Sequence, residues 1–245
     1  MKKSKMLFML TVLGILLLAA FFLIQQTMGD GNTITLPGYI TDSGTGDTDH
    51  NTEDLNVITI DPNTVQAAIA TLSRPLSYHR TQTIELFWDG GSSVTTSHVA
   101  VRNGLMRVDM IYPDGTVCHT LSGNDLCAVW YDEDRTWVTL RADRYSDDAL
   151  QHIPSYESVL ELPVERIIQA EYRLLGDVYC IFVLTSEDEE GYAESYFISV
   201  QSGLLYFAER THYGEMIYRF SAVEPGSNAP DDSLFLLPDG SPFTP

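Results

Sequence analysis

The chain has 245 residues, of which 34 are Asp or Glu and 14 are Lys or Arg, so its formal net charge is -20. The charge is unevenly distributed, because the only lysines, Lys2, Lys3 and Lys5, precede the first acidic residue, Asp30. A surface this acidic repels nucleic acid and anionic lipid headgroups at long range. A role in binding DNA or RNA is therefore excluded, and the length allows one or two domains.

Residues 6–24, MLFMLTVLGILLLAAFFLI, carry no charge and would form a helix about 28 Å long, close to the thickness of a bilayer core. The preceding lysines predict that residues 1–5 stay in the cytoplasm and that the rest is exported. We favour an uncleaved transmembrane anchor, because the apolar run exceeds the usual ~7–15 residues of a signal peptide and no A-x-A-like cleavage site follows. A cleaved signal peptide is the alternative. The sequence thus predicts a single-pass protein of the cell membrane, with its N-terminus in the cytoplasm.

Residues 25–59 are rich in Gly, Thr, Asp, Ser and Asn, which predicts a flexible acidic linker. The folded part, residues 60–245, begins with a short amphipathic helix. Asp61 suits the N-cap and Pro62 the first helical position, and apolar residues follow at helical spacing from Val65 to Leu72.

Segments with alternating polar and apolar residues then follow one another, separated by short turns such as Asn103-Gly104. Two helical pieces, 146–152 and 155–160, interrupt them. Short connections favour pairing of each strand with the next, as in an antiparallel meander. The predicted strands are 78–89, 94–102, 105–112, 117–121, 126–131, 136–140, 164–174, 178–186, 194–200, 204–212 and 216–224.

Three cysteines, Cys118, Cys127 and Cys180, leave at least one thiol unpaired. A two-residue turn at Ser122-Gly123 would place Cys118 opposite Cys127, where a disulfide is conceivable. The favoured interpretation is that these cysteines are small buried apolar residues.

Three stretches resemble a known family. These are RNGLMRVDMIYPDG at 102–115, SGNDLCAVWYDEDRTWVTL at 122–140, and a closing Asp-x-x-Phe-x-x-Pro-x-Gly pattern at 232–240. The layout from about Asp61 to Gly240 is similar to the LolA/LolB-like superfamily of envelope proteins, which includes lipoprotein carriers, a sigma-factor regulator and a spore-germination lipoprotein.

The resemblance implies a mainly β fold: a half-open antiparallel barrel, here of about eleven strands, whose apolar concave face is capped by helices. It implies a membrane-anchored, non-catalytic module outside the cytoplasm that holds a lipid, a lipoprotein or another hydrophobic ligand. The alternative is a protein-docking adaptor or sensor in envelope-stress or sporulation and germination signalling, with an envelope protein as its partner.

Apolar and aromatic residues in the alternating strands are the candidates for contact with such a ligand, although the same residues could simply form the core. They are Ile84, Leu86, Trp88, Met106, Val108, Met110, Tyr196, Ile198, Met216, Tyr218 and Phe220.

Catalytic chemistry is not predicted. Cys118 and His119 are adjacent in a strand, so their side chains point to opposite faces and cannot form a dyad. The six histidines show no metal-ligand spacing, and the carboxylates cluster in turns. The sequence therefore predicts no catalytic residues, no metal and no cofactor.

Overall fold

The computed structural model describes residues 59–124, 126–132, 136–141, 154–226 and 228–244. The chain divides into two units between Ile58 and Thr59, and the described residues all belong to the second. The expected tail at 1–5, the anchor at 6–24, nearly all of the linker at 25–59 and the helical piece at 146–152 lie outside the described residues.

Within the described ranges, the structure contains no helix long and apolar enough to span a membrane.

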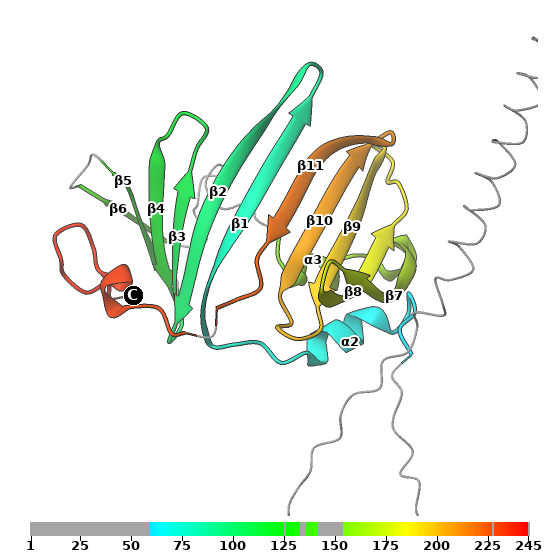
Figure 1. The fold of residues 1–245 in the computed structure, drawn as a ribbon, viewed down its shortest axis with the longest axis horizontal. Helices are drawn as coiled ribbons and strands as arrows, with labels where there is room; N and C mark the ends of the chain where they lie inside the picture. The colour runs from blue at the N-terminus through cyan, green and yellow to red at the C-terminus, as the bar shows by residue number, and fades with distance from the viewer. Residues whose placement is uncertain (1–58, 125, 133–135, 142–153, 227, 245) are drawn as a thin grey trace, which may run out of the picture. The chain divides into compact units, whose positions relative to one another are not determined.

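Eleven antiparallel strands form one sheet in the order β6-β5-β4-β3-β2-β1-β11-β10-β9-β8-β7 (Figure 1). Each described strand pairs with its neighbours in sequence, with one exception: β6 and β7 do not pair with each other but lie at the two edges. The sheet is joined instead by the pairing of β1 with β11. This confirms the antiparallel meander of eleven strands. The strands are β1 (Ser77–Trp88), β2 (Gly91–Arg102), β3 (Leu105–Ile111), β4 (Val117–Gly123), β5 (Leu126–Tyr131), β6 (Val138–Arg141), β7 (Ile167–Leu175), β8 (Val178–Thr185), β9 (Tyr192–Ser199), β10 (Leu205–His212) and β11 (Glu215–Ala222).

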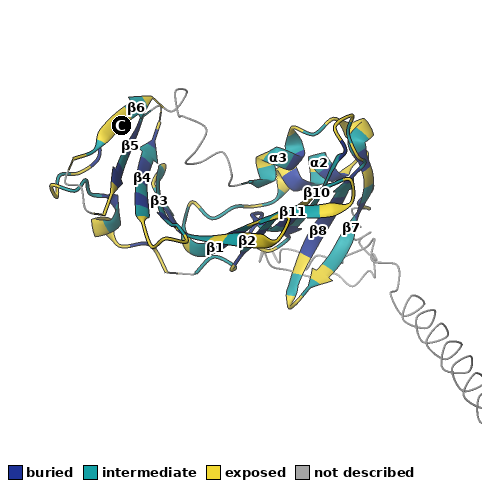
Figure 2. Cartoon of the chain, turned by 90° about the horizontal axis from the view of Figure 1, so that it is seen from above, coloured by how far each residue is buried: buried dark blue, intermediate teal, exposed yellow. Residues whose placement is uncertain are grey.

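The sheet is curved and open, and its two described α-helices lie on the inner face (Figure 2). The helical elements are α2 (Val65–Thr71), α3 (Tyr156–Leu160) and the 3-10 turns η2 (Val164–Arg166) and η3 (Asp232–Phe235). Both α-helices confirm the expectation of one helix before the strands and one in mid-chain, although the second prediction began one residue earlier.

The main core lies between these helices and the inner face of β1 and β7–β11. Ile84, Phe220, Ala208 and Tyr196 form one row across four strands, because each is paired with the next in the strand register. Apolar side chains of the helices, such as Val65 of α2, pack onto this row.

One glutamine ties the two helices together. The Nε2 atom of Gln66 in α2 donates to the carbonyl oxygens of Val159 and Leu160 in α3, at 2.9 and 3.2 Å, and to that of Leu162 just after it, at 2.8 Å. The carbonyls of Val159 and Leu160 are in the last turn of α3, where carbonyls have no i+4 N–H partner within the helix. The amide of Gln66 therefore satisfies the end of α3 from a neighbouring helix.

The first helix begins later than expected. Its N-cap is Thr64, not Asp61, and Pro62 lies in the turn before it. The carboxylate of Asp61 accepts from the backbone N–H groups of Asn63, at 2.7 Å, and Thr64, at 3.1 Å. These are the N–H groups that an N-cap side chain satisfies, and the carbonyl of Asp61 also accepts from the N–H of Val65 at 3.0 Å, so Asp61 still caps the turn that leads into the helix.

The β4–β5 hairpin also turns later than expected, at Asn124, whose φ of 48° is in the left-handed region that Asn tolerates. This register pairs Cys118 with Tyr131 and Cys127 with Ser122. The possibility of a Cys118–Cys127 disulfide is therefore excluded. All three cysteines are free and buried, which confirms the favoured interpretation.

A second core lies on the other, outer face of the sheet, where the C-terminal segment 228–244 packs against β2–β5. Phe235 and Phe243 are buried there against a cluster that includes Leu121 and Trp130. Arg102 fixes the segment by donating to the carbonyl of Pro230 at 2.9 Å. The two faces of the sheet are thus covered by different parts of the chain.

Replacing Phe220 by Ala should lower the free energy of unfolding by about 3–5 kcal/mol, because its side chain is fully buried at the centre of the inner row. Chemical denaturation followed by tryptophan fluorescence measures this. Leu76→Ala is the control: Leu76 is 88% exposed, so the change should stay within about 0.5 kcal/mol. Equal effects of the two substitutions would contradict the assigned core.

Candidate functional site

All eleven residues predicted to contact a ligand lie on the inner face of the sheet. Ile84 of β1 is paired with Phe220 of β11, and Leu86 with Tyr218, so these side chains point to the same face. The pairing of Ala208 with both Phe220 and Tyr196 extends this face to β9. On the other side, β2 pairs with β3 so that Met106, Val108 and Met110 share the same face. The structure therefore brings the predicted set to one surface, but it does not gather the set into one cavity.

Burial separates the members of this set. Ile84, Tyr196, Ile198 and Phe220 belong to the core beneath the helices. Leu86 and Trp88, at the far end of β1, are exposed. Of the β3 residues, Val108 and Met110 are buried and Met106 is half-buried. On β11, Met216 and Tyr218 are also half-buried. Contact with a ligand stays a prediction for all of them.

A cavity of 410 Å³ lies on the inner face, between α3 with the residues that follow it and strands β9–β11. Ser158, Glu161 and Leu162 line it from the helical side. Tyr196, Ala208 and Tyr218 line it from the sheet. Two of the predicted residues, Tyr196 and Tyr218, are therefore part of one hollow.

An ion pair stands in the wall of this cavity. Arg210 of β10 is paired with Glu194 of β9 in the register, and its Nε and Nη2 atoms donate to Oε1 of Glu194 at 2.9 and 2.5 Å. The Glu194 side chain is only 11% exposed. Burial alone would lower the pKa of Arg210, but the hydrogen bond and charge of Glu194 outweigh it and raise that pKa. Arg210 is therefore held in its charged form.

The two tyrosines of the cavity stay neutral. Burial raises the pKa of Tyr218, and it raises the pKa of Tyr196, where the charge of Glu194 and a hydrogen bond to it act in the same direction. The cause is desolvation, which penalises the phenolate. This part of the inner face therefore disfavours an added negative charge.

Sequence reasoning missed Glu194, Arg210 and Glu161 as cavity residues. Glu194 is two positions before Tyr196, so alternation already put both on one face. The position of Arg210 beside Glu194 depends on the β9–β10 register, which is irregular between Leu205 and Phe207. Only the position of α3 over β9–β11 makes these charged residues walls of a cavity, and no local pattern indicates that position.

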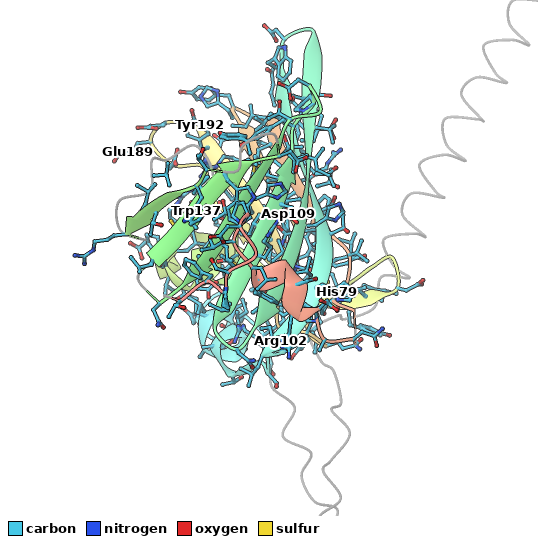
Figure 3. The ribbon with its side chains drawn as sticks, turned by 90° about the vertical axis from the view of Figure 1, so that its left-hand side faces the viewer. His79, Arg102, Asp109, Trp137, Glu189 and Tyr192 are labelled. Atoms are coloured by element: carbon cyan, nitrogen blue, oxygen red, sulfur yellow. The ribbon has the colours of Figure 1, made fainter. Side chains whose placement is uncertain are left out.

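A second cavity, of 320 Å³, lies on the outer face between β1–β3 and the C-terminal segment. His79, His98, Arg107 and Asp109 contribute polar groups, and Leu234 contributes an apolar one. Figure 3 shows His79, Arg102 and Asp109 around the part of the chain where the C-terminal segment crosses the sheet. The sequence did not predict this hollow, because no local pattern indicates where the C-terminal segment docks.

Cys118 and His119 point to opposite faces, as predicted. His119 lies on the outer face, where its two ring nitrogens lie 2.7 Å from an oxygen of Asp109 and 2.6 Å from one of Asp132. Its ring stacks on Trp130 at 5.4 Å between centroids. Both nitrogens are occupied, so this histidine has none left to activate a nucleophile.

Among the described residues, no group of three or more His, Cys, Asp or Glu side chains is placed to hold a metal ion.

No family model and no curated protein matches the chain. Solved structures with a similar fold include LppX, a lipoprotein of Mycobacterium tuberculosis. The two sequences are 10% identical, and the match covers 69% of this chain and 94% of the LppX chain, with a TM-score of 0.40. A LolA superfamily protein of Nitrosomonas europaea is 9% identical over 72% of this chain and 98% of its own, with a TM-score of 0.36. It is a member of the superfamily that the sequence resembles.

A third similar structure is MucB in complex with MucA, 16% identical over 74% of this chain and 60% of that chain, with a TM-score of 0.38. At these identities and TM-scores, the likenesses carry no argument about what this chain binds.

The thiols should be unreactive in the folded protein. Burial, with a smaller contribution from the charge of Glu224, raises the pKa of Cys180 to about 12, so at pH 8 almost none of it is the reactive thiolate. Burial also raises the pKa of Cys118. A colorimetric thiol reagent should therefore label the three cysteines only after denaturation. Rapid labelling of the native protein, or a disulfide found by mass spectrometry, would contradict this.

Proposed function

We propose that the described domain is a non-catalytic binding module that holds a hydrophobic ligand, a lipid or the lipid part of a lipoprotein, in the inner-face cavity. The observation that carries the proposal is the 410 Å³ hollow between α3 and β9–β11. Its volume falls in the lower part of the ~300–1,000 Å³ range of small-molecule sites. One chain or ring system fits that volume better than a lipid with several chains.

The lining of the cavity supports this function. Leu162, Pro163 and the rings of Tyr196 and Tyr218 provide apolar surface. The charged groups come from four side chains, Glu161, Glu194, Glu209 and Arg210. Ligand sites typically combine such an apolar lining with a few placed polar groups. Of the four charged side chains, Glu209 pairs with Arg219, which is adjacent to the inner-face residue Phe220 and therefore lies on the other face of the sheet.

We propose further that residues 6–24 anchor this module to the cell membrane, with the domain outside the cytoplasm. The support is the uncharged apolar run preceded by lysines. Alkaline extraction of membranes tests it: the full chain should stay with the membrane, and release of the full chain into the soluble fraction would contradict an anchor.

Filling the cavity should abolish ligand binding. Ala208 is buried in its floor, and Ala208→Phe adds a ring where a ligand would lie. Native mass spectrometry of gently purified protein should show a bound hydrophobic mass on the unchanged chain and none on the variant. Ala229→Phe is the matched control, because it places the same ring in the outer cavity.

A ligand lost from Ala229→Phe and kept by Ala208→Phe would move the site to the outer face. A clean unliganded mass for the unchanged chain, also after incubation with a lipid extract, would contradict the proposed function. Thermal denaturation of both variants separates loss of ligand from loss of fold.

Docking of an envelope protein is the second candidate, and exposed apolar side chains at the β7 edge favour it. Ile168 and Leu174 of β7 are each 57% exposed, and Tyr179, paired with Leu174 across the β7–β8 hairpin, is 60% exposed. An edge strand also presents backbone groups that another chain can pair with. Exposed apolar groups beside such an edge are typical of interaction surfaces.

Leu174→Ser combined with Tyr179→Ser should remove a partner that is crosslinked to this edge in membranes. The physical reason is the loss of apolar surface that a partner would bury. The matched control is Leu76→Ser with Tyr213→Ser, which removes one exposed Leu and one exposed Tyr elsewhere. Crosslinked species with the same yield in both double variants would argue against docking at β7.

A further inference from the structure

The cavity between α3 and β9–β11 has an unbalanced set of charges. Three carboxylates, Glu161, Glu194 and Glu209, and one guanidinium, Arg210, line the hollow, and Glu209 is paired with Arg219 outside it. Among the described residues, no cation forms an ion pair with Glu161, which is exposed at the end of α3. The mouth of the cavity therefore carries excess negative charge.

Arg210 already has a carboxylate partner, which an anionic ligand would have to share. Its Nε and Nη2 atoms are both directed at the same oxygen of Glu194, at 2.9 and 2.5 Å. A carboxylate or phosphate that approached Arg210 would have to compete with Glu194 and would lie beside that buried carboxylate. Like charges in a poorly solvated site repel strongly, so this exchange is unfavourable.

Glu194, by contrast, keeps capacity for a donor. An ionised carboxylate has about four acceptor positions. Arg210 uses two of them, on Oε1, and the phenol of Tyr196 forms a further hydrogen bond with the carboxylate. A donor on a ligand can take what remains, and Glu161 on the opposite wall offers a second carboxylate.

The environment of Tyr196 and Tyr218 also disfavours an anionic ligand, in agreement with the excess of carboxylates around the cavity. The same burial that makes the Tyr196 and Tyr218 phenolates unfavourable would act on the carboxylate of a fatty acid placed next to them. Burial penalises a cation as well, but beside Glu161 and Glu194 attraction offsets that cost. The net charge of -20 on the chain adds to this preference at longer range.

We propose that the inner-face cavity takes a single-chain amphiphile whose polar end is a cation, an ammonium or a similar nitrogen group, and that Glu161 and Glu194 select it over carboxylate- or phosphate-headed ligands. This inference rests on the proposed function of the same cavity. Glu161 and Glu194 are thus specificity-determining residues, while Tyr218, Leu162 and Ala208 contact the apolar chain.

Three probes with the same twelve-carbon chain test the proposal: dodecylamine, dodecanol and dodecanoate. Each competes with a neutral fluorescent probe, N-phenyl-1-naphthylamine, on the full-length chain in nanodiscs of zwitterionic lipid. The signal from Ala208→Phe, whose cavity is filled, is subtracted to remove partitioning into lipid. We expect dodecylamine to displace the probe at about one tenth of the concentration that dodecanoate needs, with dodecanol between them.

Glu161→Gln removes one carboxylate from an exposed position and keeps the shape of the side chain. It should reduce the preference for dodecylamine over dodecanoate to about threefold or less. Glu165→Gln is the matched control: Glu165 is also exposed, lies four residues further along the chain and does not line the cavity. It should leave the preference unchanged.

The outcomes separate the two levels of the argument. If none of the three probes gives displacement that Ala208→Phe removes, the proposed function itself fails. If dodecanoate binds as tightly as dodecylamine or more tightly, the cavity binds amphiphiles but the charge selection is wrong. An amine preference that persists in Glu161→Gln and in Glu161→Gln combined with Glu194→Gln also overturns the selection.

Discussion

The pairing of β1 with β11 is the constraint on which the rest of the domain depends. Every other pair of neighbouring strands in the described sheet is also adjacent in sequence, so each could form from a local hairpin or short connection. The β1–β11 pair joins the start of the strand region to its end, and it sets Ile84 opposite Phe220. Closing so long a loop costs conformational entropy that only the buried core recovers. This pair makes one continuous inner face out of two meanders, and α2 and α3 pack on that face.

The two faces of the sheet are used in different ways. The inner face carries the helices and a cavity with an ion pair in its wall, while the outer face is covered over β2–β5 by the C-terminal segment. Arg102 and Arg107 hold that segment through the carbonyls of Pro230 and Leu234, so its attachment depends on cations in a chain that has few of them. These two arginines are thus used in structural contacts.

Much of the fold could be predicted because strands reveal themselves by local alternation. The segments around Trp88, Met110, Tyr196 and Phe220 were placed in the right strands and on one common face, since a period of two residues decides the face without knowledge of partners. The helix at Val65 and the one at Tyr156 followed from spacing and from flanking prolines. In these cases the determining interactions lie within a few residues of one another.

What could not be predicted depends on contacts distant in sequence or on single turn residues. Asn124 moved a hairpin turn by two positions, and that shift separated Cys118 from Cys127. The cavity required the position of α3 over β9–β11, together with a register that sets Arg210 beside Glu194, and neither has a local signature.

The amide of Gln66 has a mechanical consequence. Because one side chain holds the carbonyls at and just beyond the end of α3, the two short helices are coupled as a single rigid cover. Any widening of the space above Tyr218 must either break the hydrogen bonds of the Gln66 amide or lift both helices together. A guest too bulky for the resting hollow would therefore displace α2 and α3 as a pair.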